Sequence, residues 1–236
     1  NSINYAEIKG GIVGLALQTI PGKSNPVDLL LTNTSIQHMS AFGLRAADAR
    51  ITGFNNIFSS CGICAITLEG GGYYEFYHST IANWFTYNSR NTPSIFLSNY
   101  FIYPESNGNN VKDIRNLEKA YFGNSIVYGS NPTEIAWSED TLGLMNYRFE
   151  NCLIKFDTSD ILLNGNSHFV NCINYKDPLF LNTDKYDFHF DTLEVSPARD
   201  LGKYEIGAAI PLDLDGLSRI TDGKPDIGAY EFILQE

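Results

Sequence analysis

Polar and apolar residues alternate along short runs that recur through most of the chain at intervals of 20 to 27 residues. Each run contains a small polar residue that is followed two positions later by an apolar residue. The polar members are Thr34, Asn55, Ser79, Asn99, Asn124, Asn151 and Asn171, and a weaker first copy lies at Tyr5-Ala6-Glu7-Ile8. Alternation with period two predicts β-strands, and no run shows the 3.6-residue period that a helical repeat requires.

This repeat predicts an all-β fold, a single parallel β-helix whose short strands come from about eight stacked coils. One coil cannot bury its inner face, so neighbouring coils must supply the hydrophobic core to one another. We expect residues 1–176 to form the coils and residues 177–236 to form a cap continuous with them. Two polar stretches, near residues 103–120 and 128–147, predict loops that protrude from coils, where solenoids often place binding groups.

Asparagine recurs at the predicted turn between two strands of a coil, where it tolerates left-handed backbone angles. Its amide can also hydrogen-bond to the copies above and below, so we expect a ladder of stacked amides. The residues concerned are Asn55, Asn124, Asn151 and Asn171. Cys152 and Cys172 directly follow two of these asparagines, which predicts a structural stack of two thiols.

The composition suits strands and tight turns, with 43% apolar, 13% aromatic and only 18% charged residues. The net charge of −11 disfavours nucleic acid, polyuronates and anionic lipid unless a cation bridges them. No apolar run is long enough to span a membrane, so we expect membrane attachment only through an anchor outside this chain. The chain begins at Asn1, so we interpret it as a processed chain or a fragment.

A different pattern follows the last repeat. Its elements are Asp177-Pro178-Leu179-Phe180, Tyr186-Asp187-Phe188-His189-Phe190, Ser196-Pro197-Ala198-Arg199-Asp200-Leu201-Gly202, Asp213-Leu214-Asp215-Gly216-Leu217-Ser218-Arg219 and Pro225-Asp226-Ile227-Gly228-Ala229-Tyr230-Glu231. This series resembles the C-terminal end of secreted β-helix proteins of the pectin-lyase-like superfamily, especially Bacteroides-type surface proteins of unassigned function. The resemblance implies a right-handed β-helix in an extracytoplasmic place (cell surface, outer membrane or secreted). It also implies further coils before this chain. Such a resemblance supports an inference about the fold more strongly than one about the activity.

The terminal motif also has a physical interpretation. A solenoid end exposes strand edges and apolar side chains, which a cap with a polar outer side would cover. We expect Arg219 to pair with Asp226 or Glu231 and to fasten the last strand. An alternative is a calcium site, because its aspartates resemble calcium-loop ligands. Its ligands would be Asp213, Asp215, Asp222 and Asp226, and we expect no other cofactor.

Enzymes of the resembled superfamily cleave acidic polysaccharides with an acid cluster beside a basic residue, or with short motifs in successive coils. Neither arrangement is visible here, so the catalytic residues are unknown. Glycoside hydrolysis would need a pair of carboxylates, and the sequence suggests candidates for such a pair only by their position in the coils. They are Glu69, Glu75, Glu150, Asp157 and Asp160.

Aromatic residues give a better functional indication, because rings stack on sugar faces and Tyr and Trp add hydrogen bonds. The candidates for a sugar platform are Tyr73, Tyr74, Trp84, Tyr87, Tyr103 and Trp137, and the alternative is that they stack in the core. The sequence therefore favours a non-catalytic surface protein that binds a glycan or a partner. Two alternatives stay open, a polysaccharide lyase or glycoside hydrolase with part of its site in missing N-terminal coils, and a structural or adhesive stalk.

Overall fold

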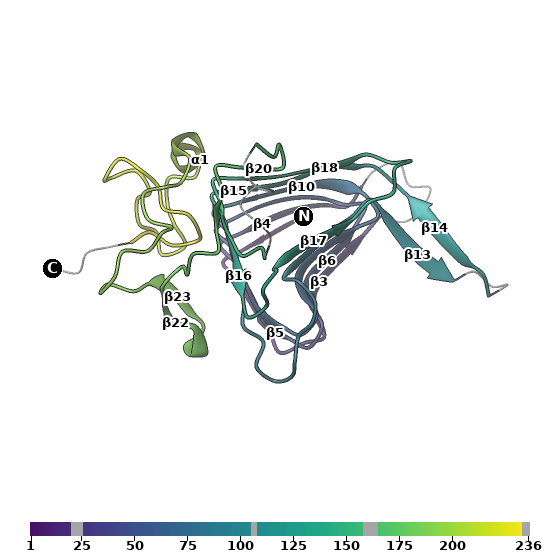
Figure 1. Ribbon diagram of the computed structural model, residues 1–236, viewed down its shortest axis with the longest axis horizontal. Coiled ribbons are helices and arrows are strands. Elements are labelled where there is room, and N and C mark those ends of the chain that lie inside the picture. The colour runs from purple at the N-terminus through teal and green to yellow at the C-terminus, as the bar shows by residue number, and fades with distance from the viewer. Residues whose placement is uncertain (20–25, 105–107, 158–164, 233–236) are drawn as a thin grey trace.

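The computed structural model describes residues 1–19, 26–104, 108–157 and 165–232, and its described elements are almost all β-strands (Figure 1). Three parallel sheets contain most of the strands. Sheet A contains β1 (Ser2–Asn4), β4 (Asp28–Thr32), β7 (Arg50–Phe54), β10 (Gly72–Tyr77), β15 (Leu117–Gly123), β18 (Met145–Glu150) and β20 (Phe169–Val170). Sheet B contains β2 (Glu7–Lys9), β5 (Ser35–Met39), β8 (Ile57–Cys61), β11 (Thr80–Asn83), β16 (Ile126–Gly129), β19 (Leu153–Ile154) and β21 (Ile173–Asn174). Sheet C contains β3 (Val13–Gln18), β6 (Phe42–Ala47), β9 (Cys64–Glu69), β12 (Ile95–Ser98) and β17 (Ile135–Ser138).

The chain passes through sheets A, B and C in turn, and we call one such passage a circuit. Each circuit adds its strand beside the equivalent strand of the previous one, so that Ile51 of β7 pairs with Leu29 of β4 and with Tyr74 of β10. The long parallel sheets were predicted from the repeat, and they are compatible with a β-helix. Sheets A and B have seven strands each, one fewer than the eight predicted coils.

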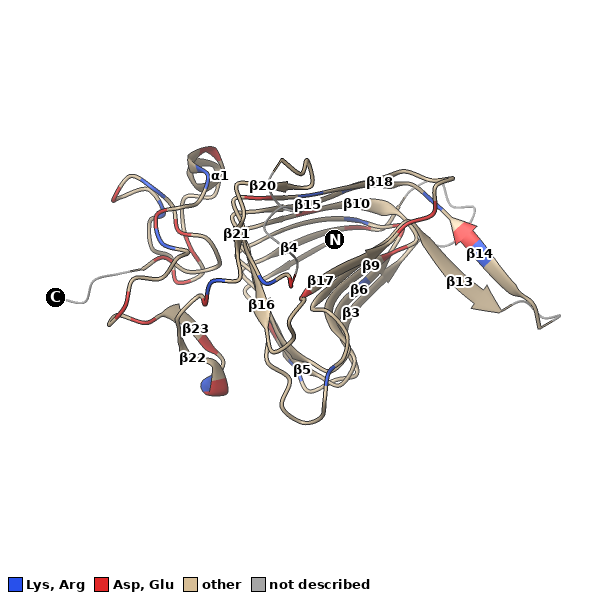
Figure 2. Cartoon of the chain, in the orientation of Figure 1, with Lys and Arg blue, Asp and Glu red and all other residues tan. Residues whose placement is uncertain are grey.

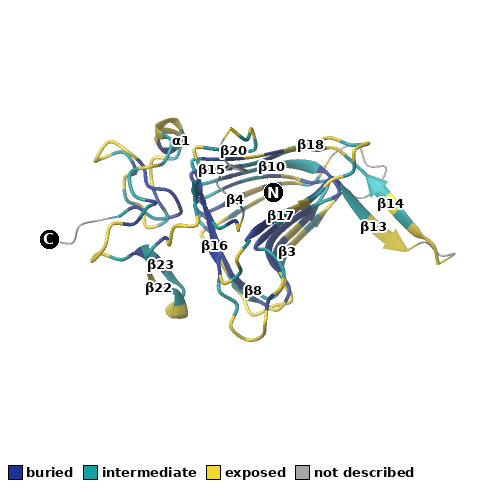
Figure 3. Cartoon of the chain, viewed as in Figure 1, coloured by how far each residue is buried: buried dark blue, intermediate teal, exposed yellow. Residues whose placement is uncertain are grey.

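The core lies between the three sheets, and Figure 3 shows buried residues along the strands that enclose it. In β10, for example, buried and half-buried residues alternate from Tyr73 to Tyr77. Phenylalanines of sheet A lie above one another there. Phe122 stacks on Phe76 with ring centroids 5.3 Å apart and on Phe149 at 4.7 Å, and Phe149 stacks on Phe169 at 5.4 Å. Each of these rings fills the interior of its own circuit and covers the ring of the next, which is how neighbouring circuits bury one another's apolar surface.

A left-handed residue follows each strand of sheet A and turns the chain into sheet B. These residues are Tyr5, Asn33, Asn55, His78, Asn124, Asn151 and Asn171, with φ between 43° and 54°. The prediction is right for the last three asparagines and for Asn55. It is one position late at Thr34 and Ser79, because the turning residues there are Asn33 and His78.

Asn99 is not at such a corner. One circuit extends from His78 to Asn124 because it includes a hairpin, β13 (Tyr100–Pro104) with β14 (Asn110–Ile114), which pairs in antiparallel fashion and projects from the sheets (Figure 1). The stretch predicted as a loop near residues 103–120 thus contains strands, and no helix among its described residues. The stretch near residues 128–147 is not only a loop either, since it includes β17, an edge strand of sheet C.

The C-terminal strap, residues 177–232, contains a second hairpin and two short helical segments. They are β22 (Phe180–Asn182), η2 (Thr183–Lys185), β23 (Asp187–Phe190) and α1 (Tyr204–Ala209). We expected this region to cap the end of the last coil, but it lies beside the corner between sheets A and B (Figure 1). It contacts several circuits there, with hydrogen bonds to Asn55, Thr80, Asn124 and Asn151.

The strap packs on the outer side of sheet B, which explains why apolar residues occur on both faces of that sheet. Ile57 and Ile126 point outward into clusters that include Phe188 and Phe190 of β23. Among the described residues, no helix is long and apolar enough to cross a membrane.

Candidate functional site

The asparagines of the A/B corner hold the strap as well as the turn. Asn33 donates to Asn4 and Asn55 donates to Asn33, which are steps of the predicted amide ladder. Asn55, Asn124 and Asn151 also bind the strap. Asn124 Nδ2 donates to Lys203 O at 3.0 Å and Asn124 Oδ1 accepts from Lys203 N at 2.7 Å. Asn55 and Asn151 likewise donate to strap carbonyls.

A buried ionic cluster forms the interior of the strap. Arg219 Nη1 lies 2.5 Å from Glu231 Oε1, so of the two expected partners it is Glu231 that pairs with this arginine. Arg219 Nη2 also donates to Asn55 Oδ1 at 2.9 Å, which ties the cluster to sheet A. Burial raises the pKa of Glu231 to about 8 and that of Asp226 to about 6, although Arg219 opposes the rise for Glu231.

The four aspartates proposed as calcium ligands do not gather. Asp213 accepts three backbone N–H groups, Asp226 accepts two, Asp215 faces His189, and Asp222 is exposed. In the part of the chain that the structure describes, no three His, Cys, Asp or Glu side chains are placed to hold a metal ion. The motif thus fastens the strap with hydrogen bonds.

The two stacked cysteines follow the corner residue, at a register that serine occupies in earlier circuits. Cys152 Sγ contacts Glu150 O at 3.4 Å, as Ser125 Oγ contacts Gly123 O at 2.9 Å. Cys172 lies over Cys152 on the next circuit, and neither forms a disulfide. This arrangement is the thiol stack that the register predicted.

Three of the six proposed ligand-binding aromatics are part of packed clusters. Tyr74 is fully buried, and its hydroxyl donates to Gly71 O and accepts from Ala49 N. Trp84 is half-buried between Tyr128 and Phe180. Trp137 belongs to an inward-facing column and stacks on Phe156 at the last circuit, which leaves 37% of it exposed.

The other three aromatics reach solvent at separate places. Tyr103 lies on the projecting hairpin with 41% of its surface exposed, and Tyr87 is 75% exposed beside a cavity of about 440 Å³ that His38 and Phe85 also line. Tyr73 is on the outer face of sheet A, half-buried. The six residues therefore do not form one platform.

Three tyrosines, including Tyr73 of that set, do share one surface. Tyr73, Tyr77 and Tyr121 all point outward from β10 and β15, where Tyr77 and Tyr121 have ring centroids 5.5 Å apart. The alternation of β10, with Tyr74 and Phe76 inward, positions these rings on the surface. We call the outward side of β7, β10, β15 and β18 the tyrosine face.

Two carboxylates on the tyrosine face hold the tyrosine hydroxyls and the neighbouring cations. Tyr73 and Tyr77 donate to Glu75, which also pairs with Lys119. Tyr121 donates to Glu150 at 2.6 Å. Figure 2 shows both signs of charge along these strands.

Glu150 also receives positive charge from Arg148 and from Lys203 of the strap, each at 3.1 Å. Burial raises the pKa of Glu150, but the hydrogen bonds from Tyr121 and Lys203 outweigh burial and leave the pKa below its ordinary value. Burial and Glu150 both raise the pKa of Tyr121. Glu150 is therefore an ionised acceptor with its oxygens already engaged.

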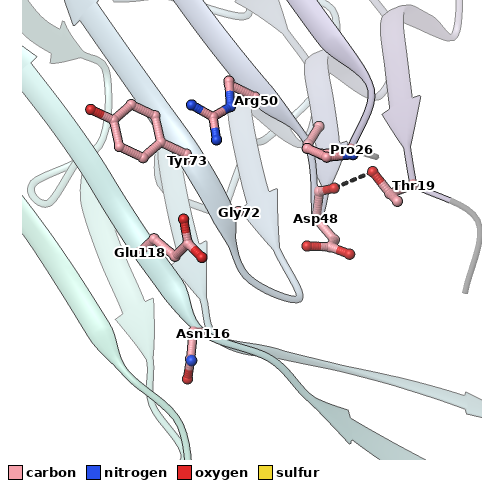
Figure 4. Close-up of a pocket in the computed structure, with 9 residues that line it drawn as sticks. Thr19, Pro26, Asp48, Arg50, Gly72, Tyr73, Asn116 and Glu118 are labelled. Atoms are coloured by element: carbon pink, nitrogen blue, oxygen red, sulfur yellow. Dashed lines mark hydrogen bonds between the residues drawn. The ribbon is translucent and has the colours of Figure 1, made fainter. Parts of the chain in front are cut away.

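A cavity of about 240 Å³ opens at one end of the tyrosine face, where β7 and β10 begin (Figure 4). Its lining residues are Thr19, Pro26, Asp48, Ala49, Arg50, Gly72, Tyr73, Asn116 and Glu118. Gly72 has φ +116°, and a Cβ there would come within 2.5 Å of the Tyr74 hydroxyl. Only glycine therefore lets the chain turn this tightly beside the cavity.

Sequence reasoning missed Tyr121 and Lys119, and it noted Tyr77 as an aromatic residue without including it among the proposed ligand-binding residues. A signal was present in the alternation of Tyr73, Glu75 and Tyr77, which places all three on one side of a strand. Of the carboxylates proposed by location, Glu75 and Glu150 share this face. Glu69 pairs with Arg45 on sheet C, Asp157 is exposed, and Asp160 lies outside the described residues.

No protein-family model, curated protein or solved structure matches this chain. The resemblance to secreted pectin-lyase-like proteins gains no support from these comparisons, and the long parallel sheets are compatible with the fold it implies.

Proposed function

We propose that this chain is a non-catalytic binding protein whose tyrosine face holds a glycan. The observation that carries the proposal is the group of Tyr73, Tyr77 and Tyr121, three outward rings on two adjacent strands with their hydroxyls fixed by carboxylates. Rings held this way lose little freedom on binding, and aromatic side chains pack favourably against sugars. We also propose that the sheets are those of a right-handed β-helix, and that the protein acts outside the cytoplasm.

The carboxylates favour binding over catalysis. A glycosidase needs a general acid whose pKa is raised, whereas the pKa of Glu150 is lowered. The carboxyls with raised pKa values, Asp226 and Glu231, are buried inside the strap and bonded to backbone N–H groups or to Arg219. They are not positioned to reach a ligand on the tyrosine face.

A glycan array tests the proposal. The wild-type chain should bind at least one oligosaccharide, and Tyr121→Ala should weaken that binding about tenfold, as expected for an aromatic contact residue. Tyr87→Ala is the matched control, because it removes an equally large exposed ring outside the tyrosine face. Equal loss in both variants, or in neither, would refute the proposed location.

The alternative hypothesis is that the protein is an enzyme. It is favoured by the pairing of Glu75 with Lys119, a carboxylate beside a basic residue on the tyrosine face. Incubation with polysaccharides, with and without calcium, should release neither new reducing ends nor unsaturated uronates. New ends alone would indicate a hydrolase and both products a lyase, and either would overturn the non-catalytic proposal. A chain that binds no glycan and cleaves none would fit a structural stalk.

A further inference from the structure

The cavity beside Tyr73 continues the tyrosine face. Tyr73 and Arg50 belong to both, because they are register partners on adjacent strands. Figure 4 shows Glu118 and Asp48 approaching the cavity from different strands and turns, with the Tyr73 ring at its upper end. At about 240 Å³ the cavity is below the range of about 300–1,000 Å³ typical of pockets for drug-sized ligands, which suits one small ring.

The cavity offers hydrogen-bond acceptors with spare capacity. Glu118 is exposed, and within the described residues its carboxylate has no hydrogen-bond or ion-pair partner. Asp48 binds Arg115 Nη1 through Oδ2 at 2.7 Å, which leaves lone pairs on its carboxylate. Asn116 Oδ1 accepts from Leu144 N, and its side chain extends away from Glu118 and Asp48 (Figure 4). Carboxylates accept short, strong hydrogen bonds from hydroxyl groups.

The same cavity is unfavourable for an anion. Arg50 is the one cation among the described residues that line the cavity. The Arg50 guanidinium lies 5.0 Å from the Tyr73 ring centroid and 3.5 Å from Asp28, so it is already engaged on both sides. Arg115 behind the cavity is bound by Asp48 and Asp113. Within the described residues, an acidic sugar would therefore meet Asp48 and Glu118 without a free cation to compensate.

We propose that this cavity is a specificity subsite that takes one uncharged sugar ring of the bound glycan and rejects uronic acids. The sugar ring lies in the cavity beside Tyr73 and directs hydroxyl groups at Glu118 and Asp48. This inference rests on the proposed glycan binding by the tyrosine face and adds the class of sugar.

Titration calorimetry on the full chain tests the subsite, with neutral hexose oligosaccharides, oligouronates and amino-sugar oligomers as separate probes. The neutral series should bind about tenfold or more tightly than the uronates. Glu118→Gln should weaken neutral binding about tenfold and narrow the preference over uronates, because it replaces a charged acceptor by a weaker one. Glu205→Gln, an exposed acid-to-amide change on α1, should leave both unchanged.

Equal affinity for uronates and neutral sugars would overturn the subsite, as would a preference for amino sugars. If Tyr121→Ala abolishes binding while Glu118→Gln has no effect, the tyrosine face binds glycans and the subsite is wrong. If no oligosaccharide binds the wild-type chain, both the proposed function and the subsite are wrong. Circular dichroism of each variant separates loss of binding from loss of folding.

Discussion

At the corner between sheets A and B, each circuit needs a residue that accepts a positive φ, and asparagine fills most of these places. Asparagine is suited to the corner for two reasons, its tolerance of left-handed angles and an amide that can hydrogen-bond outward. Asn124 uses both properties, since it turns the chain and binds the backbone of Lys203 twice. Asn171 uses only the first within the described residues, since its side chain is exposed.

The difference between these two asparagines predicts unequal effects of the same substitution. Asn124→Ala should lower the free energy of unfolding by about 2–4 kcal/mol, from left-handed strain together with two lost hydrogen bonds. Asn171→Ala should cost only the strain, about 1–2 kcal/mol. Urea denaturation of the two variants measures the difference, and equal losses would show that Asn124 does not hold the strap.

Cysteine at the position after the corner should be replaceable. Cys152→Ser should change the free energy of unfolding by less than about 1 kcal/mol, because Ser125 makes the same contact one circuit earlier. Urea denaturation under reducing conditions measures this, with Cys172→Ser as the half-buried counterpart. A loss of several kcal/mol from either variant would contradict a purely structural thiol stack.

Residue type and spacing thus predicted the corner wherever asparagine occupies it. They failed at His78, because the pattern required a small polar residue and the serine after His78 met that requirement. A shift of one position exchanges the two faces of a strand. Ile81 was therefore aligned with Ile57, although Ile81 faces the core and Ile57 faces the strap.

At the scale of structural elements, the strap contains three groups whose pKa values are raised, His189, Asp226 and Glu231. His189 on β23 hydrogen-bonds Asp187 at 2.5 Å and Asp215 at 2.9 Å, and its ring stacks on Tyr230. Burial lowers the pKa of His189, but the two aspartates outweigh burial and leave the pKa raised. The protonated ring therefore links the β22–β23 hairpin to the turn that contains Asp215.

The strap should be held more tightly at pH 6 than at pH 9. His189, Asp226 and Glu231 all have folded-state pKa values above their ordinary ones, so each contributes stability at low pH that is lost as the pH rises through its folded-state value. For Glu231 that value is about 8. Limited proteolysis at several pH values should cut the strap more readily above pH 8, and Glu231→Gln should reduce this dependence. Equal cleavage rates at both pH values would contradict the prediction.

A buried ion pair fixes the connection between sheets B and C. Arg90 and Glu134 have fully buried side chains and bind each other through two N–H···O contacts, at 2.6 and 2.9 Å. Ser94 also donates to Glu134 through its backbone and its hydroxyl. No pattern in the sequence indicated this pair, because its members are 44 residues apart and meet only when β12 and β17 are adjacent.

Removal of one member of this pair should be costly. Glu134→Ala should lower the free energy of unfolding by about 3–5 kcal/mol, because it leaves Arg90 buried without a counter-charge. Glu69→Ala breaks the Arg45–Glu69 pair on the outer side of sheet C, where Arg45 is half exposed, and should cost no more than about 1 kcal/mol. Chemical denaturation measures the free energy of unfolding of both variants. Similar losses would show that burial does not determine how much the Arg90–Glu134 pair contributes to stability.

At the scale of the whole molecule, period-two alternation predicted the parallel sheets, because burial of one strand face is a local property of sequence. The lateral position of the strap was not predictable in this way. It depends on contacts such as Asn55 with Arg219, between residues far apart in the sequence. The proposed binding surface was half predicted, since Tyr73 was named as a ligand-binding residue and Tyr121, one circuit away, was not.

Hydrogen–deuterium exchange with the tightest-binding oligosaccharide tests the central claim, that the tyrosine face is the binding surface, most directly. Bound glycan should slow exchange in residues 50–54, 72–77 and 117–123, the strands that present Arg50, Tyr73, Tyr77 and Tyr121. Exchange in the β13–β14 hairpin and around Tyr87 should not change. Protection at the hairpin or around Tyr87, with none on β10 and β15, would contradict the account.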